Sequence, residues 1–68
     1  MLDEQLLTTR ERDAAVLLAY GYTNRDVARE LHVSERTIES ERARIMRKLG
    51  FAHRAELVRW ALQRGLLR

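Results

Sequence analysis

Three glycines most restrict how this 68-residue chain can fold, because each follows a segment whose apolar residues recur at helical spacing. Gly21, Gly50 and Gly65 stand where helices commonly end on a residue that accepts a left-handed backbone. Residues that can cap a helix N-terminus, such as Thr8 and Ser34, precede these segments. No stretch alternates apolar and polar residues as a strand does. The sequence therefore predicts an all-α fold.

Four helices are expected, over residues 9–20, 24–31, 34–49 and 54–64, in one domain that spans 8–68. Residues 1–7 are interpreted as an N-terminal tail or a linker remnant. The apolar residues at i, i+3 and i+4 in each helix should face the core. They are Ala14, Leu17, Leu18, Val27, Ala28, Leu31, Ile38, Ile45, Leu49, Leu57, Val58 and Ala61, with Met46 to one side.

Charge is distributed unevenly along the chain. Residues 1–33 hold four Arg against six Asp and Glu, net −2, whereas residues 34–68 hold nine Arg and Lys against four Glu, net +5. The longest apolar run, residues 14–20, is too short to span a membrane. The chain contains no Cys, which fits a reducing compartment. We expect a cytoplasmic protein with no membrane association.

The helix over residues 34–49 has a polar outer face opposite its apolar stripe. Arg36, Ser40, Ala43 and Arg47 lie there. The two short side chains allow close approach to a surface, and the arginines can bind phosphates or guanine edges. The alternative is that these arginines only keep the helix soluble. Two short helices joined by a tight turn, the second of them basic, favour a helix-turn-helix DNA-binding motif.

Several separate motifs carry a family resemblance. They are Leu-Thr-Thr-Arg-Glu-Arg at 7–12, Gly-Tyr-Thr-Asn-Arg-Asp-Val-Ala at 21–28, Val-Ser-Glu-Arg-Thr-Ile at 33–38, and Arg-Lys-Leu-Gly at 47–50 with Arg54. With these motifs in this order, the chain resembles the DNA-binding domain of LuxR/GerE-family bacterial transcription regulators. The resemblance implies a four-helix (tetrahelical) fold with the third helix as recognition helix in the major groove. It also implies the output domain of a response regulator or other signal-responsive regulator, or a stand-alone small regulator.

The resemblance assigns roles to residues of the third helix. Base-facing positions are Glu39, Ser40 and Ala43, and Thr37, Arg44, Arg47 and Lys48 lie where phosphates or outer bases are contacted. To these contacts we add Arg36, on the outer face of the same helix, and Arg54, at the start of the fourth helix. Many relatives have a basic residue at position 39 and His at position 41, where this chain has Glu39 and Glu41. Glu39 is expected to be solvated, paired with Arg36 or Arg42, or to accept from a cytosine amino group. Glu41 is expected to pair with an arginine of another helix.

Two further surfaces are predicted to meet protein partners. The resemblance makes the fourth helix a homodimer contact, with Arg59, Trp60, Gln63 and Arg64 as its residues. For Trp60 the alternative is a place at the edge of the core. Val16 and Tyr20, at i and i+4 on the first helix, lie away from the core stripe. We expect them to contact an upstream regulatory domain, RNA polymerase or a second protomer, against the alternative that they are ordinary exposed apolar residues.

No catalytic function is expected. His32 and His53 have no metal-ligand spacing, and no catalytic triad, phosphate loop or paired inward carboxylates can be assembled, so no metal or cofactor is predicted. The interpretation is sequence-specific binding of double-stranded DNA as a dimer, to regulate transcription. The alternatives are a promoter-binding domain like region 4 of sigma factors, and a protein-interaction module on the same fold with weak DNA affinity.

Overall fold

The computed structural model describes residues 6–67, which form four α-helices and contain no strand. The helices are α1 (Thr9–Ala19), α2 (Asn24–Leu31), α3 (Glu35–Leu49) and α4 (Arg54–Gln63). Each boundary lies within one residue of the boundary expected from the sequence. The all-α prediction is confirmed.

Local hydrogen bonds explain where three of the helices begin. The side chains of Thr8, Thr23 and Ser34 each accept the backbone N–H of the residue three positions later, at 3.1, 3.1 and 3.0 Å. These bonds satisfy N–H groups that the first helical turn leaves without a partner inside the helix. The capping residues recognised in the sequence therefore act as N-caps.

The helices α2 and α3 end on left-handed residues of different kinds. The C-cap of α3 is Gly50, at φ 73°, as expected. The C-cap of α2 is His32, at φ 58° and ψ 45°, the one non-glycine residue with positive φ in the described part of the chain. The sequence contains no glycine there, so only the structure reveals how α2 ends.

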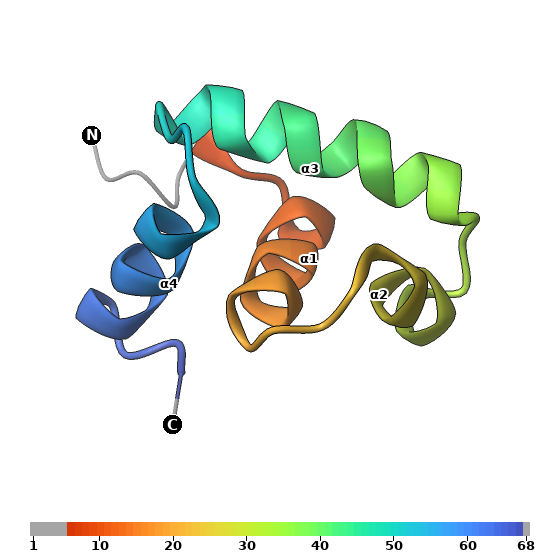
Figure 1. Cartoon of the computed structure of the whole chain (residues 1–68), viewed down its shortest axis with the longest axis horizontal. Helices are drawn as coiled ribbons and strands as arrows, with labels where there is room; N and C mark the ends of the chain where they lie inside the picture. The colour runs from red at the N-terminus through yellow and green to blue at the C-terminus, as the bar shows by residue number, and fades with distance from the viewer. Residues whose placement is uncertain (1–5, 68) are drawn as a thin grey trace.

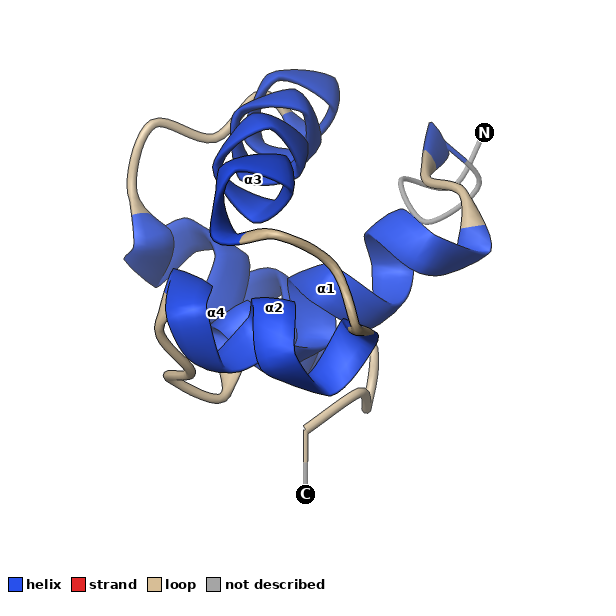
Figure 2. Ribbon diagram, turned by 90° about the vertical axis from the view of Figure 1, so that its right-hand side faces the viewer, coloured by secondary structure: helices blue, strands red, loops and turns tan. Residues whose placement is uncertain are grey.

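The third helix lies across the other three, all of which are on the same side of it (Figure 1). The view turned by 90° agrees: α3 forms a layer of its own above α1, α2 and α4 (Figure 2). None of the other three helices covers the far side of α3. One long face of this helix is therefore open to solvent.

The core lies between these two layers. Eight of the apolar residues predicted to face the core are buried, and Leu17, Leu31, Met46, Leu49 and Val58 are half-buried. The prediction omitted Ala15 and Ala19, which are also buried. Trp60, for which a place at the core edge was the alternative to a dimer contact, is buried as well. Leu7 packs in this core although it lies in the segment interpreted as a tail. Residues 1–5 of that segment lie outside the described residues.

Candidate nucleic-acid interface

The outer face of α3 brings together most of the predicted DNA-contacting residues. Ile38 and Ile45 are fully buried, and they fix the rotation of the helix so that the residues opposite them point away from the core. Thr37 is half-buried at the edge of this face. The exposed residues are Arg36, Glu39, Ser40, Ala43, Arg44, Arg47 and Lys48.

A shallow groove of about 330 Å³ runs beside the N-terminal half of this face. Hydroxyl, guanidinium and carboxylate groups all line it, from Ser34, Arg36, Thr37, Ser40, Glu41 and Arg44. The hydroxyl oxygens of Ser34 and Thr37 lie 2.8 Å apart, so the residue that caps α3 also orders one end of the groove. The arrangement offers several donors to an anion that approaches α3.

The carboxylate of Glu11 ties the edge of α3 to the first turn of α1. Its Oε1 accepts from Lys48 Nζ at 2.7 Å and from the Thr8 backbone N–H at 2.9 Å, and its Oε2 lies 3.7 Å from Arg44 Nη1. The residue is 3% exposed. Burial by itself raises the pKa of Glu11, but the Lys48 and Thr8 hydrogen bonds and the charges of Lys48 and Arg44 outweigh burial and hold that pKa below its ordinary value.

Glu41 pairs with an arginine of another helix, as predicted. Its Oε2 lies 3.2 Å from Nε of Arg10, near the start of α1, and the residue is 7% exposed. Glu39 differs from it, because it is exposed and forms no ion pair within residues 6–67. Of the two alternatives weighed for Glu39 in the free protein, the solvated side chain is the one observed.

Arg54 is separated from the other predicted phosphate contacts. Its Nε and Nη2 donate to the carbonyl oxygen of Leu18 at 3.0 and 2.6 Å, and Nη2 also donates to the carbonyl of Tyr22 at 2.6 Å. The guanidinium thus satisfies carbonyl groups at the end of α1. It does not extend from the outer face of α3 with the other arginines.

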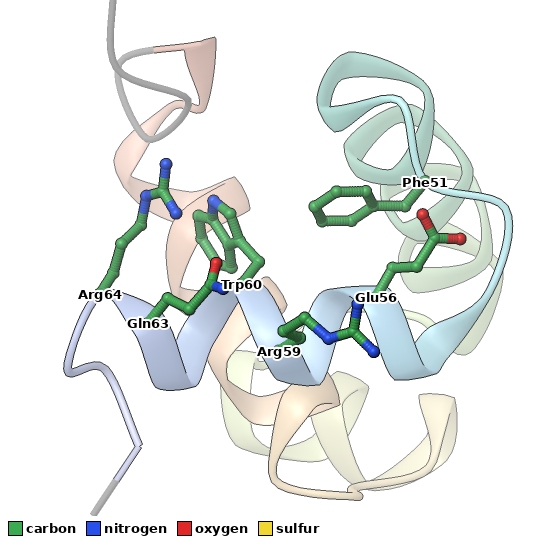
Figure 3. Close-up of a pocket in the computed structure, with 6 residues that line it drawn as sticks. All are labelled: Phe51, Glu56, Arg59, Trp60, Gln63 and Arg64. Carbon is green, nitrogen blue, oxygen red and sulfur yellow. The ribbon is translucent and has the colours of Figure 1, made fainter.

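The predicted dimer residues lie around one pocket on α4, of about 180 Å³ (Figure 3). Trp60 is only 2% exposed, so its ring belongs mainly to the core. The guanidinium carbon of Arg64 lies 5.5 Å from the centre of that ring, a cation–π distance. Arg59 and Gln63 are exposed. The surface of α4 around this pocket is therefore polar, with the aromatic ring beneath it.

The residues of the second predicted partner surface, at the end of the first helix, differ in their exposure to solvent. Tyr20 is 48% exposed, and Tyr22 in the turn that follows is 39% exposed. Val16 is half-buried. The tyrosines rather than the valine therefore account for most of the apolar surface that this region exposes.

The sequence analysis did not identify two features of this region. They are the participation of Arg10 and the ion pairs of Glu11. The capping-box spacing of Thr8 and Glu11 indicated that a helix begins at this point, and Glu11 does accept the Thr8 N–H. Its pairing with Lys48, 37 positions away, left no local signal. The one usable indication was Glu41, whose place near the core predicted an arginine partner without identifying Arg10.

Within residues 6–67 no three His, Asp or Glu side chains are grouped as a metal site would require. No helix in the same range is both long enough and apolar enough to cross a membrane.

Comparison with known proteins gives matches that cover most of this chain. The family described as "Bacterial regulatory proteins, luxR family" matches residues 5–61. The oxygen regulatory protein NreC of Staphylococcus aureus is 41% identical over 63 residues in strains JH9, Mu3 and NCTC 8325. The aligned region covers 93% of this chain and 29% of each relative. The chain therefore spans less than a third of the length of these relatives.

Proposed function

The chain belongs to the luxR family of bacterial regulatory proteins, a family of helix-turn-helix, DNA-binding and non-enzymatic transcription regulators, and we propose that it binds double-stranded DNA sequence-specifically as a dimer. In this proposal α3 enters the major groove. Binding at a promoter then changes transcription, in the cytoplasm where the bacterial chromosome lies.

The observation that carries the proposal is the open face of α3. No other helix covers this face, and exposed Arg36 and Arg47 stand on it with the short side chains of Ser40 and Ala43 between them. Short outward side chains let a helix lie close to base edges in the major groove. Arginines on either side reach the phosphates that border the groove.

The residues of this face divide into two groups. Ser40, Ala43 and Glu39 face base edges, where the exposed carboxylate of Glu39 can accept from the amino group of a cytosine. The phosphate contacts are Arg36, Thr37, Arg44, Arg47 and Lys48. We leave Arg54 out of the phosphate group because α1 carbonyl oxygens engage its guanidinium.

The proposal extends to the longer regulator and to the protein partners of this domain. Because the chain matches less than a third of the NreC proteins, we propose that it is the DNA-binding part of a longer regulator that responds to a signal. The exposed face of α4 joins two copies. Tyr20, together with Val16, contacts RNA polymerase or the signal-receiving part of the regulator.

Fluorescence anisotropy with a labelled random-sequence duplex tests DNA binding at a series of salt concentrations. The unaltered chain should bind, with an affinity that falls steeply as salt rises, because phosphate contacts release condensed cations. Arg47→Ala should weaken binding and reduce the slope of log K against log salt by about 0.9.

Arg12→Ala is the matched control, because Arg12 is exposed on α1 and forms no ion pair within residues 6–67. It should leave the slope unchanged. An unaltered chain that shows no salt-sensitive binding would refute DNA binding and favour the protein-interaction module. If Arg47→Ala keeps the full slope, Arg47 is not a phosphate contact.

A further inference from the structure

We propose that Arg10 is a further phosphate contact of the DNA-binding surface, and that Glu41 holds its guanidinium in position. The inference rests on the proposed function. Arg10 belongs to α1 rather than to the helix-turn-helix, and Glu41 is the carboxylate that the sequence sets inside a basic region. The proposal therefore gives a positive role to a residue whose charge by itself opposes DNA binding.

The ion pair leaves most of the Arg10 guanidinium accessible. The Arg10 side chain is 50% exposed, whereas that of Glu41 is 9% exposed. The closest approach is through Nε of Arg10, and its two terminal nitrogens form no hydrogen bond to residues 6–67. A guanidinium has five N–H donors in a planar fork, so one side can bind a carboxylate while the other binds a phosphate.

The position of Glu41 on α3 places this guanidinium beside other predicted phosphate contacts. At 100° per residue, Thr37, Glu41, Arg44 and Lys48 fall within about 60° of one another around the helix. They occupy about 16 Å along its axis. Arg10, bound to Glu41, adds a cation between Thr37 and Arg44 on this edge, next to the groove that Thr37, Glu41 and Arg44 line.

The charges along this edge still favour an anion. Glu11 and Glu41 are the two carboxylates, and both are buried; Arg10, Arg44 and Lys48 are the three cations that pair with them, and all three are partly exposed. The carboxylates thus orient the cations from the protein side, and the excess positive charge faces solvent. This is the arrangement that binds a phosphate with little reordering of long side chains.

Stability by itself gives a poor reason for Glu41. Its Oε1 is buried and has no hydrogen-bond partner within residues 6–67. A buried carboxylate oxygen in that state is costly, and an ion pair through one nitrogen compensates burial only partly. A glutamate that is costly to the fold and bound to a half-exposed arginine fits a positioning residue for DNA binding.

The test measures salt-dependent anisotropy for Arg10→Ala, Glu41→Gln and the double variant. Arg10→Ala should weaken binding by about tenfold and reduce the salt slope by about 0.9. Glu41→Gln should also weaken binding, although it makes the chain more positive, because Arg10 is no longer held. The double variant should bind no more weakly than Arg10→Ala, since Glu41 acts only through Arg10.

Two matched controls calibrate these results. Arg12→Ala removes the same charge from α1 two residues away, about 200° around the helix, and should keep the slope. Glu35→Gln makes the same charge change as Glu41→Gln on α3, at an exposed carboxylate outside the proposed DNA contacts that forms no ion pair within residues 6–67. It measures the effect of the added charge alone. Thermal unfolding checks that each variant is folded, and Arg10→Ala, at a half-exposed residue, decides the question even if Glu41→Gln unfolds.

The inference is wrong if Arg10→Ala keeps the slope of the unaltered chain, or if Glu41→Gln binds more tightly, as charge alone would predict. Either result leaves the proposed function standing, provided that the unaltered chain binds and Arg47→Ala lowers the slope. Loss of salt-sensitive binding by the unaltered chain would instead remove the proposed function, and this inference with it.

Discussion

Glu11 combines a local and a long-range role in one carboxylate. It caps α1 through the Thr8 N–H and binds Lys48 at the far end of α3. The local role is readable from the spacing of Thr8 and Glu11. The long-range role depends on how α1 packs against α3, and no spacing within either segment encodes that.

The lowered pKa of Glu11 predicts how stability depends on pH. The folded chain holds this carboxyl ionised more strongly than the unfolded chain does, so Glu11 stabilises the fold fully above the ordinary glutamate pKa of about 4.3. The contribution should be lost as pH falls from there through the lower pKa of the folded state. Thermal unfolding followed by circular dichroism between pH 7 and pH 2.5 measures this loss.

Glu11→Gln should lower stability at pH 7 by about 1–2 kcal/mol, because it replaces a charged acceptor by a neutral one while Lys48 and Arg44 stay partly exposed to solvent, and should flatten the acid limb of the curve. Glu30→Gln is the control, since Glu30 is exposed and forms no ion pair within residues 6–67; it should change little. A Glu11→Gln curve parallel to that of the unaltered chain would contradict the assignment.

At the scale of the element, two helix ends have nearly the same backbone conformation although their residues differ. His32 and Gly50 both close a helix in the left-handed conformation, at φ 58° and 73°. The Cβ of a non-glycine residue makes that conformation costly by about 1–2 kcal/mol. A Cβ built at Gly50 meets nothing within 4 Å, so the preference for glycine there is conformational rather than a matter of space.

Exchanging these residues should move stability in opposite directions. His32→Gly should stabilise the chain by up to about 1 kcal/mol, because glycine relieves the strain but loses more entropy on folding. Gly50→Ala should destabilise it by about 1 kcal/mol. Urea unfolding of both variants and the unaltered chain measures the two changes, and changes of the same sign would contradict this account of the helix ends.

At the scale of the whole molecule, the layered arrangement separates the surface proposed to bind DNA from the surface proposed to join two copies. The open face of α3 points away from the other helices, while α4 lies in the opposite layer (Figure 2). Leu62 is 58% exposed on α4, and Arg59 and Gln63 are exposed beside it. Since Trp60 is buried within its own chain, these three residues supply the surface through which α4 would join two copies.

Dimeric binding predicts two chains on one duplex that carries two half-sites about one helical turn apart. Sedimentation velocity with labelled duplex should detect that species for the unaltered chain. Leu62→Asp should reduce it to one chain per duplex at the same concentration, because the added charges meet across the contact. Leu6→Asp, at a leucine 42% exposed before α1, is the control and should leave two chains bound.

Equal stoichiometry for Leu62→Asp and the unaltered chain would exclude α4 as the contact. A single bound chain in every case would exclude dimeric binding on this spacing, while leaving DNA binding by one α3 untouched.

The sequence by itself determined the helices and the outward face of α3. Caps, glycine stops and the 3.6-residue period act within a few residues, so Thr8, Ser34 and Gly50 mark helix ends without knowledge of the fold. The same period places Ser40 and Ala43 on the face of the helix opposite Ile38 and Ile45, whatever packs beneath the helix.

Only the tertiary structure decided the partners of charged and aromatic side chains. Arg54 and Arg47 are both arginines of a basic segment, yet Arg54 binds the carbonyl of Leu18 in α1 and that of Tyr22 in the turn after α1, 36 and 32 positions away. Glu41 found its partner in Arg10, and Trp60 became core rather than surface. These outcomes depend on how the helices cross, and crossing geometry is set by the packing of several side chains at once rather than by the spacing of residues along any one helix.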